Sequence, residues 1–138
     1  MDDQRLFSNA ITVLGKVLDF RSIRHNLIVS NIANMDTPRY QAKDLVFEDE
    51  LKGALHRGEN RMISTHNRHF PMGVRDMEDV KPRIMYCKNL ILSNDLNTVD
   101  IEKEMGKLAE NNLMYTIAAQ IMGKKLEGLK NAIREGGR

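Results

Sequence analysis

The chain has 138 residues, a length that fits one domain or one elongated unit and is too short for a large multidomain enzyme. It carries 21 Lys and Arg against 19 Asp and Glu, and the resulting net charge of +2 is spread along the sequence. Binding to nucleic acid needs clustered positive charge that displaces counterions, so the composition argues against a nucleic-acid partner. Trp is absent and aromatic residues make up 5% of the chain, which argues against a large aromatic core.

The N-terminal residues do not resemble a secretory signal. Asp2 and Asp3 stand where such a signal needs positive charge, and Lys16 interrupts any apolar stretch behind them. No apolar run in the sequence approaches the ~20 residues that cross a bilayer. We therefore expect a protein that stays in the cytoplasm or is exported without a cleaved signal peptide.

Residues 1–35 are predicted to form one long coiled-coil helix. Apolar residues recur there at alternating steps of four and three, which is the spacing of a heptad seam, with polar exceptions at Arg21 and His25. Pro38 has no amide proton and disfavours helical geometry before it, so the helix should end by about Asp36. The apolar positions of this seam are Phe7, Ile11, Leu14, Leu18, Ile28 and Ile32, followed by Met35.

Residues 36–97 form an irregular middle segment. They contain all three prolines and show no sustained period. A short helix is predicted over Phe47–Leu55, with its acidic residues in the first turn, and a short strand over Arg83–Cys87. The stretch His56–Lys81 is interpreted as a loop, which is unusually long for a compact domain and suggests a protein that is not compact by itself.

Residues 98–138 contain the second predicted coiled-coil helix. Asp100 is suited to cap its N-terminus, and Gly136-Gly137 to end it. A helix of about 34 residues would be roughly 50 Å long. Its apolar seam positions are Ile101, Met105, Leu108, Tyr115, Met122, Leu126, Leu129 and Ile133.

The predicted fold is mainly α. Two long terminal helices with heptad seams form an antiparallel coiled-coil pair, joined by the irregular middle segment with its short helix and β element. A single apolar stripe must be buried for a helix to be stable in water. The spacing alone leaves open whether the seams pack only on each other, as an ordinary two-helix core, or on other chains.

No group of residues predicts a reaction. His66 and His69 are three apart in a stretch interpreted as loop, without the fixed frame that a metal site needs. Cys87 is a lone cysteine on a predicted strand, and such residues are usually small core residues. The sequence therefore predicts no catalytic residue, no metal, no cofactor and no small-molecule substrate.

The end of the first helix carries a motif of small and amide side chains followed by Asp-Thr-Pro. It resembles the signature of the bacterial flagellar axial proteins, the family of rod, hook and hook-associated subunits. Residues 41–48, 97–105 and 108–111 are similar to the proximal rod members in particular. Arg39 departs from the family, which usually has Gly there, and a positive φ would strain it. The signature residues are Ser30, Asn31, Ile32, Ala33, Asn34, Asp36, Thr37, Pro38 and Tyr40.

The resemblance implies a structural subunit and no enzymatic activity. Proteins of this kind are exported without cleavage by the flagellar type III apparatus. They polymerise through their terminal helices into the basal-body rod across the periplasmic space. The implied partners are copies of the chain, other rod proteins, the basal-body protein FliE and the membrane ring. Phe7 and Ile11 match an element that the export gate reads in such substrates.

A different class of function remains open on the residues alone. A cytoplasmic helical adaptor or export chaperone would also contain two long helices. Such a protein would be self-contained and would never polymerise, so its apolar seams would be buried within the chain.

Overall fold

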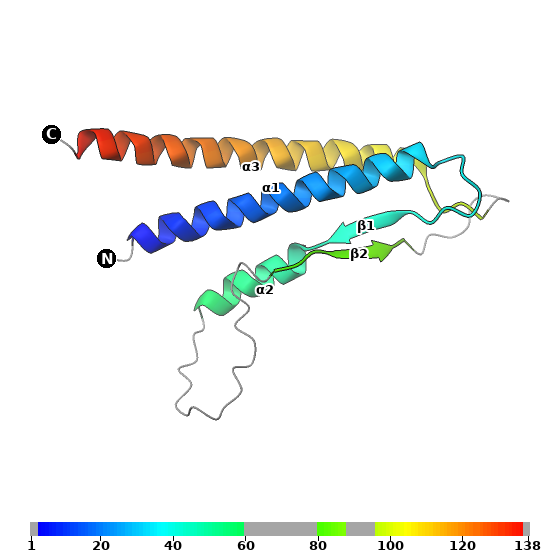
Figure 1. Ribbon diagram of the computed structural model, residues 1–138, viewed down its shortest axis with the longest axis horizontal. Coiled ribbons are helices and arrows are strands. Elements are labelled where there is room, and N and C mark those ends of the chain that lie inside the picture. Colours follow the sequence, from blue (N-terminus) through cyan, green and yellow to red (C-terminus); the bar gives the residue numbers. More distant parts are fainter. Residues whose placement is uncertain (1–2, 60–79, 88–95, 137–138) are drawn as a thin grey trace, which may run out of the picture.

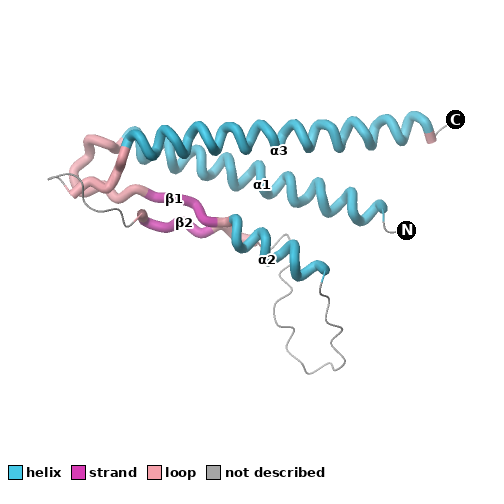
Figure 2. The backbone as a smooth tube through the Cα atoms, turned by 180° about the vertical axis from the view of Figure 1, so that it is seen from behind, coloured by secondary structure: helices cyan, strands magenta, loops and turns pink. Residues whose placement is uncertain are grey.

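The computed structural model describes residues 3–59, 80–87 and 96–136. The two long helices run antiparallel and side by side, so the two chain ends lie at the same end of the pair (Figure 1). The two strands form an antiparallel sheet that lies along the first helix, and the short helix continues from the first strand (Figure 2). In chain order the elements are α1 (Asp3–Ala33), β1 (Lys43–Val46), α2 (Glu48–Glu59), β2 (Arg83–Tyr86) and α3 (Ile101–Glu135).

Both predicted long helices are confirmed, and they pack against each other. α1 ends at Ala33, slightly before the predicted limit at Asp36. The Asp100 side chain caps α3 as predicted, accepting a hydrogen bond from the backbone N–H of Lys103 at 3.3 Å. Gly136 follows the helix with φ −75°, so α3 ends without a left-handed glycine cap.

The middle segment contains more regular structure than the sequence predicted. The short helix is confirmed, but α2 extends to Glu59, so the first residues of the predicted loop His56–Lys81 are helical. Residues 60–79 lie outside the described residues. β2 is confirmed within Arg83–Cys87, whereas its partner β1 was not predicted. The pattern missed β1 because Lys and Asp fill half of this four-residue strand, Lys43–Val46.

The main apolar core lies between α1, β1 and α2 rather than between the two long helices. The rings of Phe20 and Phe47 meet with centroids 5.2 Å apart at an interplanar angle of 58°, which is a favourable tilted arrangement. This core therefore depends on the middle segment, where the sequence predicted no core. Its buried members are Phe20, Leu45, Phe47, Leu51 and Val80.

The contact between α1 and α3 uses a face of α3 that overlaps only part of the predicted seam. The buried positions of α3 are Glu104, Asn111 and Ala118, which are seven residues apart. Met105 and Leu126, in the neighbouring column, are 52% and 49% exposed. The structure thus does not show a coiled-coil heptad seam between the two helices. Glu104 and Asn111 take the inner positions because α1 and β1 offer them hydrogen-bond partners, as described below.

The other predicted seam residues divide by helix. On α1, Ile28 is buried, Ile11, Leu14, Leu18 and Ile32 are half-buried, and the Phe7 side chain lies outside the described part of the structure. On α3, Leu108, Met122 and Leu129 are half-buried, and Ile101, Tyr115 and Ile133 are exposed. Because half of the α3 seam faces outward, its role in contacts with other chains stays a prediction.

Candidate functional site

The connection between α1 and α3 is held by one buried amide. Asn97 donates hydrogen bonds from Nδ2 to the carbonyl oxygens of Asn34 (3.0 Å), Met35 (2.8 Å) and Thr37 (2.8 Å). Its Oδ1 accepts a hydrogen bond from the backbone N–H of Val99 at 2.8 Å. The carbonyl oxygens of Asn34 and Thr37 also accept the backbone N–H groups of Thr37 and Tyr40, so Asn97 adds a second donor there and ties the turn after α1 to the segment before α3.

Asn31, in the predicted signature, is fully buried and joins three elements. Its Nδ2 donates to the carbonyl oxygen of Lys43 at 2.7 Å and to Oε2 of Glu104 at 2.8 Å. Its Oδ1 accepts from the Lys43 backbone N–H at 3.0 Å and from the Tyr40 hydroxyl at 3.3 Å. One side chain of α1 thereby fixes both β1 and α3, which explains in physical terms why an amide is needed at this position.

The rest of the signature shapes the turn after α1. Asn34 donates from Nδ2 to the carbonyl of Ser30 at 2.8 Å, and the Thr37 hydroxyl donates to Oδ1 of Asn34 at 3.2 Å. Arg39 has φ 60°, a left-handed conformation that glycine adopts without strain. The departure at Arg39 therefore costs about 1 kcal/mol relative to glycine.

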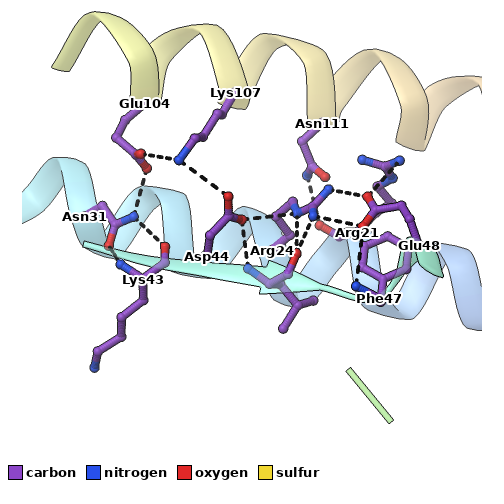
Figure 3. Close-up of polar contacts among 11 residues, drawn as sticks. Arg21, Arg24, Asn31, Lys43, Asp44, Phe47, Glu48, Glu104, Lys107 and Asn111 are labelled. Carbon is purple, nitrogen blue, oxygen red and sulfur yellow. Dashed lines mark hydrogen bonds and ion pairs between the residues drawn. The ribbon is translucent and has the colours of Figure 1, made fainter. Parts of the chain in front are cut away.

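A charged cluster links α3 to β1 (Figure 3). The Lys107 ammonium donates to Oε1 of buried Glu104 at 2.8 Å and lies 3.4 Å from Oδ2 of Asp44. Burial alone would lower the pKa of Lys107, but the hydrogen bond to Glu104 and the charge of Asp44 outweigh it and raise that pKa. Burying a carboxyl group costs free energy unless it is hydrogen-bonded, so the cluster specifies which face of α3 turns inward.

A second charged cluster fastens α1 to β1 and α2 (Figure 3). The Arg24 guanidinium donates to the Leu45 carbonyl oxygen (3.1 Å from Nε) and to Oε1 of Glu48 (2.6 Å), and it lies over the Phe47 ring. Burial would raise the pKa of Glu48, but the hydrogen bond from Arg24 leads the opposing effects that leave it lowered. Arg21 also lies over Phe47, and its pKa is lowered by burial and by neighbouring Arg24.

One polar contact of the helix pair is only partly satisfied. Asn111 donates from Nδ2 to the Arg21 carbonyl oxygen at 2.9 Å, whereas Asn111 Oδ1 and Arg21 Nε are buried without a hydrogen-bond partner. A buried unsatisfied polar atom costs about 1–3 kcal/mol. This contact therefore contributes more to the choice of helix face than to stability.

The contacts described above hold the elements of the chain together. In residues 3–59, 80–87 and 96–136 no three His, Cys, Asp or Glu side chains gather as metal ligands would. Burial raises the pKa of the half-buried Cys87 thiol, which disfavours the reactive thiolate. His66 and His69 lie outside the described residues.

Sequence reasoning found some of these residues and missed others. Asn31 and Asn97 stood in the motifs that carry the family resemblance. Arg24 was missed, and the burial of Glu104, which lies within the similar stretch 97–105, was not predicted, because periodicity weighs apolar residues only. Arg21, a polar residue within the apolar seam of α1, was the feature of the sequence that could have indicated the charged cluster nearby. None of the helices described is long and apolar enough to cross a membrane.

The fold and its polar contacts define a mainly helical structural protein whose terminal helices pair while leaving many apolar side chains at the surface. No family model matches the chain. Over 132 residues it is 32% identical to the flagellar basal body rod protein FlgB of Salmonella typhimurium, covering 92% of this chain and 94% of that protein. The FlgB of Borrelia hermsii is 32% identical over 94% of this chain and 98% of its own length. That of Cereibacter sphaeroides is 34% identical, over 93% of this chain and 96% of its own length. The chain therefore belongs to the FlgB family of flagellar basal body rod proteins.

Proposed function

We propose that the chain is a structural subunit of the proximal rod of the flagellar basal body. In this role it polymerises through its terminal helices and helps to connect the membrane ring to the rest of the drive shaft. Membership of the FlgB family supports the rod assignment. The observation that carries the polymerisation step is the apolar surface that α3 leaves uncovered.

The uncovered surface of α3 is extensive. Leu113, Ile117 and Ile121 follow one another at four-residue steps and are 59%, 41% and 44% exposed. Met105 and Leu126 expose the adjacent predicted seam column. Large exposed apolar patches mark sites of contact with other proteins, and full burial of each such side chain is worth about 1.5–3 kcal/mol. Helices of neighbouring subunits packed on this surface would complete the heptad seam that is absent within the single chain.

The proposal extends to export and to the neighbours in the basal body. The chain would leave the cytoplasm through the flagellar type III apparatus without a cleaved signal, with Phe7 and Ile11 read by the export gate. In the rod, within the periplasmic space, it would contact copies of itself, other rod proteins, FliE and the membrane ring. The family resemblance supports these partners, and the helical position of residues 7–11 in α1 is compatible with an export element.

One observation favours the second candidate, a self-contained helical adaptor or export chaperone. α1 and α3 pack on each other within one chain and share buried polar contacts. Circular dichroism of the purified, dilute chain separates the two functions. A rod subunit should lose the helicity of its terminal halves early on heating and regain it in assemblies, whereas an adaptor should melt in one cooperative transition.

The direct test replaces Leu126 by Asp in bacteria that lack their own copy of the protein. Leu126 is 49% exposed, so the change should leave the monomer intact and abolish rod assembly and motility by placing a charge in the subunit contact. Gln120→Asp, at an exposed polar position of α3, is the matched control. Export of both variants is measured in parallel, and normal motility with Leu126→Asp would contradict the proposal. Leu108→Asp is harder to interpret, because Leu108 is half-buried and the change would also affect the packing of the single chain.

A further inference from the structure

The outer edge of β1 is closed by side chains. The Cys87 backbone N–H donates to the Ala42 carbonyl oxygen at 2.8 Å, and this pair continues the antiparallel register of the two strands. Hydrogen-bonded pairs alternate along such a ladder, so Lys43 and Leu45 direct their backbone groups away from β2. Asn31 bonds both backbone groups of Lys43, and Arg24 donates to the Leu45 carbonyl. No further strand can therefore join the sheet at β1.

The outer edge of β2 has no such cover. By the same alternation, Ile84 and Tyr86 direct their backbone N–H and C=O groups away from β1. Within the described part of the chain, nothing bonds these groups. The side chains of Ile84, Met85 and Tyr86 are 56%, 54% and 59% exposed. Proteins usually protect an edge with proline, a bulge, charge or a covering element, because an open apolar edge is a template for another strand.

We infer that β2 pairs antiparallel with β2 of a second copy of this chain, centred on Met85. In this register Ile84 faces Tyr86 of the second copy and Tyr86 faces its Ile84, so all four outward pairs of backbone groups are satisfied. The two sheets then become one continuous sheet. The inference does not depend on the rod assignment, since it concerns the free chain.

The second copy is favoured as the occupant because the edge is complementary to itself. On one face of the extended sheet, each Ile84 meets a Tyr86, a favourable aromatic and β-branched pair, and on the other face the two Met85 side chains meet. Arg83 lies opposite Cys87 of the second copy, so no like charges face each other. Arg83 is also paired with Glu50, with Nε 2.9 Å from Oε1. The contact is short compared with a stable interface, so the dimer should form only at high concentration.

Disulfide formation between engineered cysteines tests the register in the full chain. With Cys87→Ser as the background, Met85→Cys places the two thiols directly opposite, with Cβ atoms roughly 4.5–5.5 Å apart. In Ile84→Cys the two engineered cysteines, one from each copy, lie diagonally across the strand pair, roughly 7–8 Å apart. The same holds for Tyr86→Cys. We expect Met85→Cys to form dimers at least about tenfold faster than either of these alone, because a disulfide cannot bridge Cα atoms beyond about 7 Å. A mixture of Ile84→Cys with Tyr86→Cys should cross-link as fast as Met85→Cys.

A charge variant gives an independent measurement by sedimentation velocity at rising concentration. Met85→Lys sets two positive charges opposite each other and should remove the dimer, whereas Leu113→Lys, at an equally exposed site on α3, should keep it. Equal oxidation rates for all three cysteine variants would overturn the inference. So would a dimer that survives Met85→Lys and disappears with Leu113→Lys, since its contact would then lie on the helix.

Discussion

The two halves of the helix pair differ in what they bury. Near the connection, α3 buries Glu104 and Asn111 at 2% exposure each, and both contact α1. Beyond Ala118, α3 has no buried residue, and the two helices lie farther apart toward the chain ends (Figure 1). Polar groups thus fix the pairing near the connection, whereas exposed apolar side chains occur on α3 both before and after Ala118, from Met105 to Ile133.

One helix can therefore serve two kinds of contact. A buried amide or carboxylate accepts few partners, because leaving it unsatisfied costs free energy. The polar half therefore selects one partner face and one register. Apolar side chains accept many neighbours, so the exposed apolar faces of α3 suit contacts with copies and relatives of the chain.

The largest expected effect comes from the centre of the polar half. Asn31→Ala should lower the free energy of unfolding by about 3 kcal/mol, because it leaves Glu104 and the Lys43 backbone without their partners. Urea unfolding followed by circular dichroism measures this loss. Asn112→Ala, at an exposed site on α3, should change stability by less than about 0.5 kcal/mol. Equal effects of the two variants would show that the buried amide contributes no more to stability than an exposed one.

A smaller loss is expected at the connection between the helices. Asn97→Ala should cost about 1–2 kcal/mol, since three carbonyl oxygens in the turn after α1 lose this donor and those of Asn34 and Thr37 keep only their backbone N–H partners. The isosteric Asn97→Asp should also destabilise, because a carboxylate cannot donate to those carbonyls. An Asp variant as stable as the parent in the same unfolding experiment would refute this role.

The strained turn predicts a gain rather than a loss. Arg39→Gly should raise the free energy of unfolding by about 1 kcal/mol or less, because glycine adopts φ 60° without a Cβ clash. The melting temperature of the variant measures the gain. Arg39→Ala is the control, since it removes the side chain and keeps the strain, and it should leave stability nearly unchanged.

The smallest effect concerns pH and the half-exposed Glu48. Its pKa is lowered in the folded chain, so its contribution to stability is present above the unfolded pKa and is lost as the pH falls. Glu48→Gln should therefore flatten the decline of the free energy of unfolding from about pH 5 downward. Arg24→Gln removes the partner and should flatten the same region, which urea titrations across pH would show. An unchanged slope in both variants would contradict the lowered pKa.

The sequence predicted the elements that depend on local signals. Asp100 caps α3 because its side chain reaches the Lys103 amide within one turn, and α1 ends at Ala33, before Pro38, which cannot continue a helix. β1 and the core around Phe47 were not predicted, because their stability comes from Phe20 and Arg24, more than twenty residues away. A pattern read along one segment contains no information about such partners.

From the sequence alone follow two long terminal helices, each with an apolar stripe that must be buried. The sequence also carried the amide motif of the flagellar axial family. The inward face of α3 follows only from the folded chain, not from the sequence pattern. The predicted seam included Met105 and Leu126, which are exposed, whereas the fold buries Glu104 and Asn111. The reason is physical: a polar side chain is buried where a distant partner satisfies it, and the position of that partner is fixed only when the chain has folded.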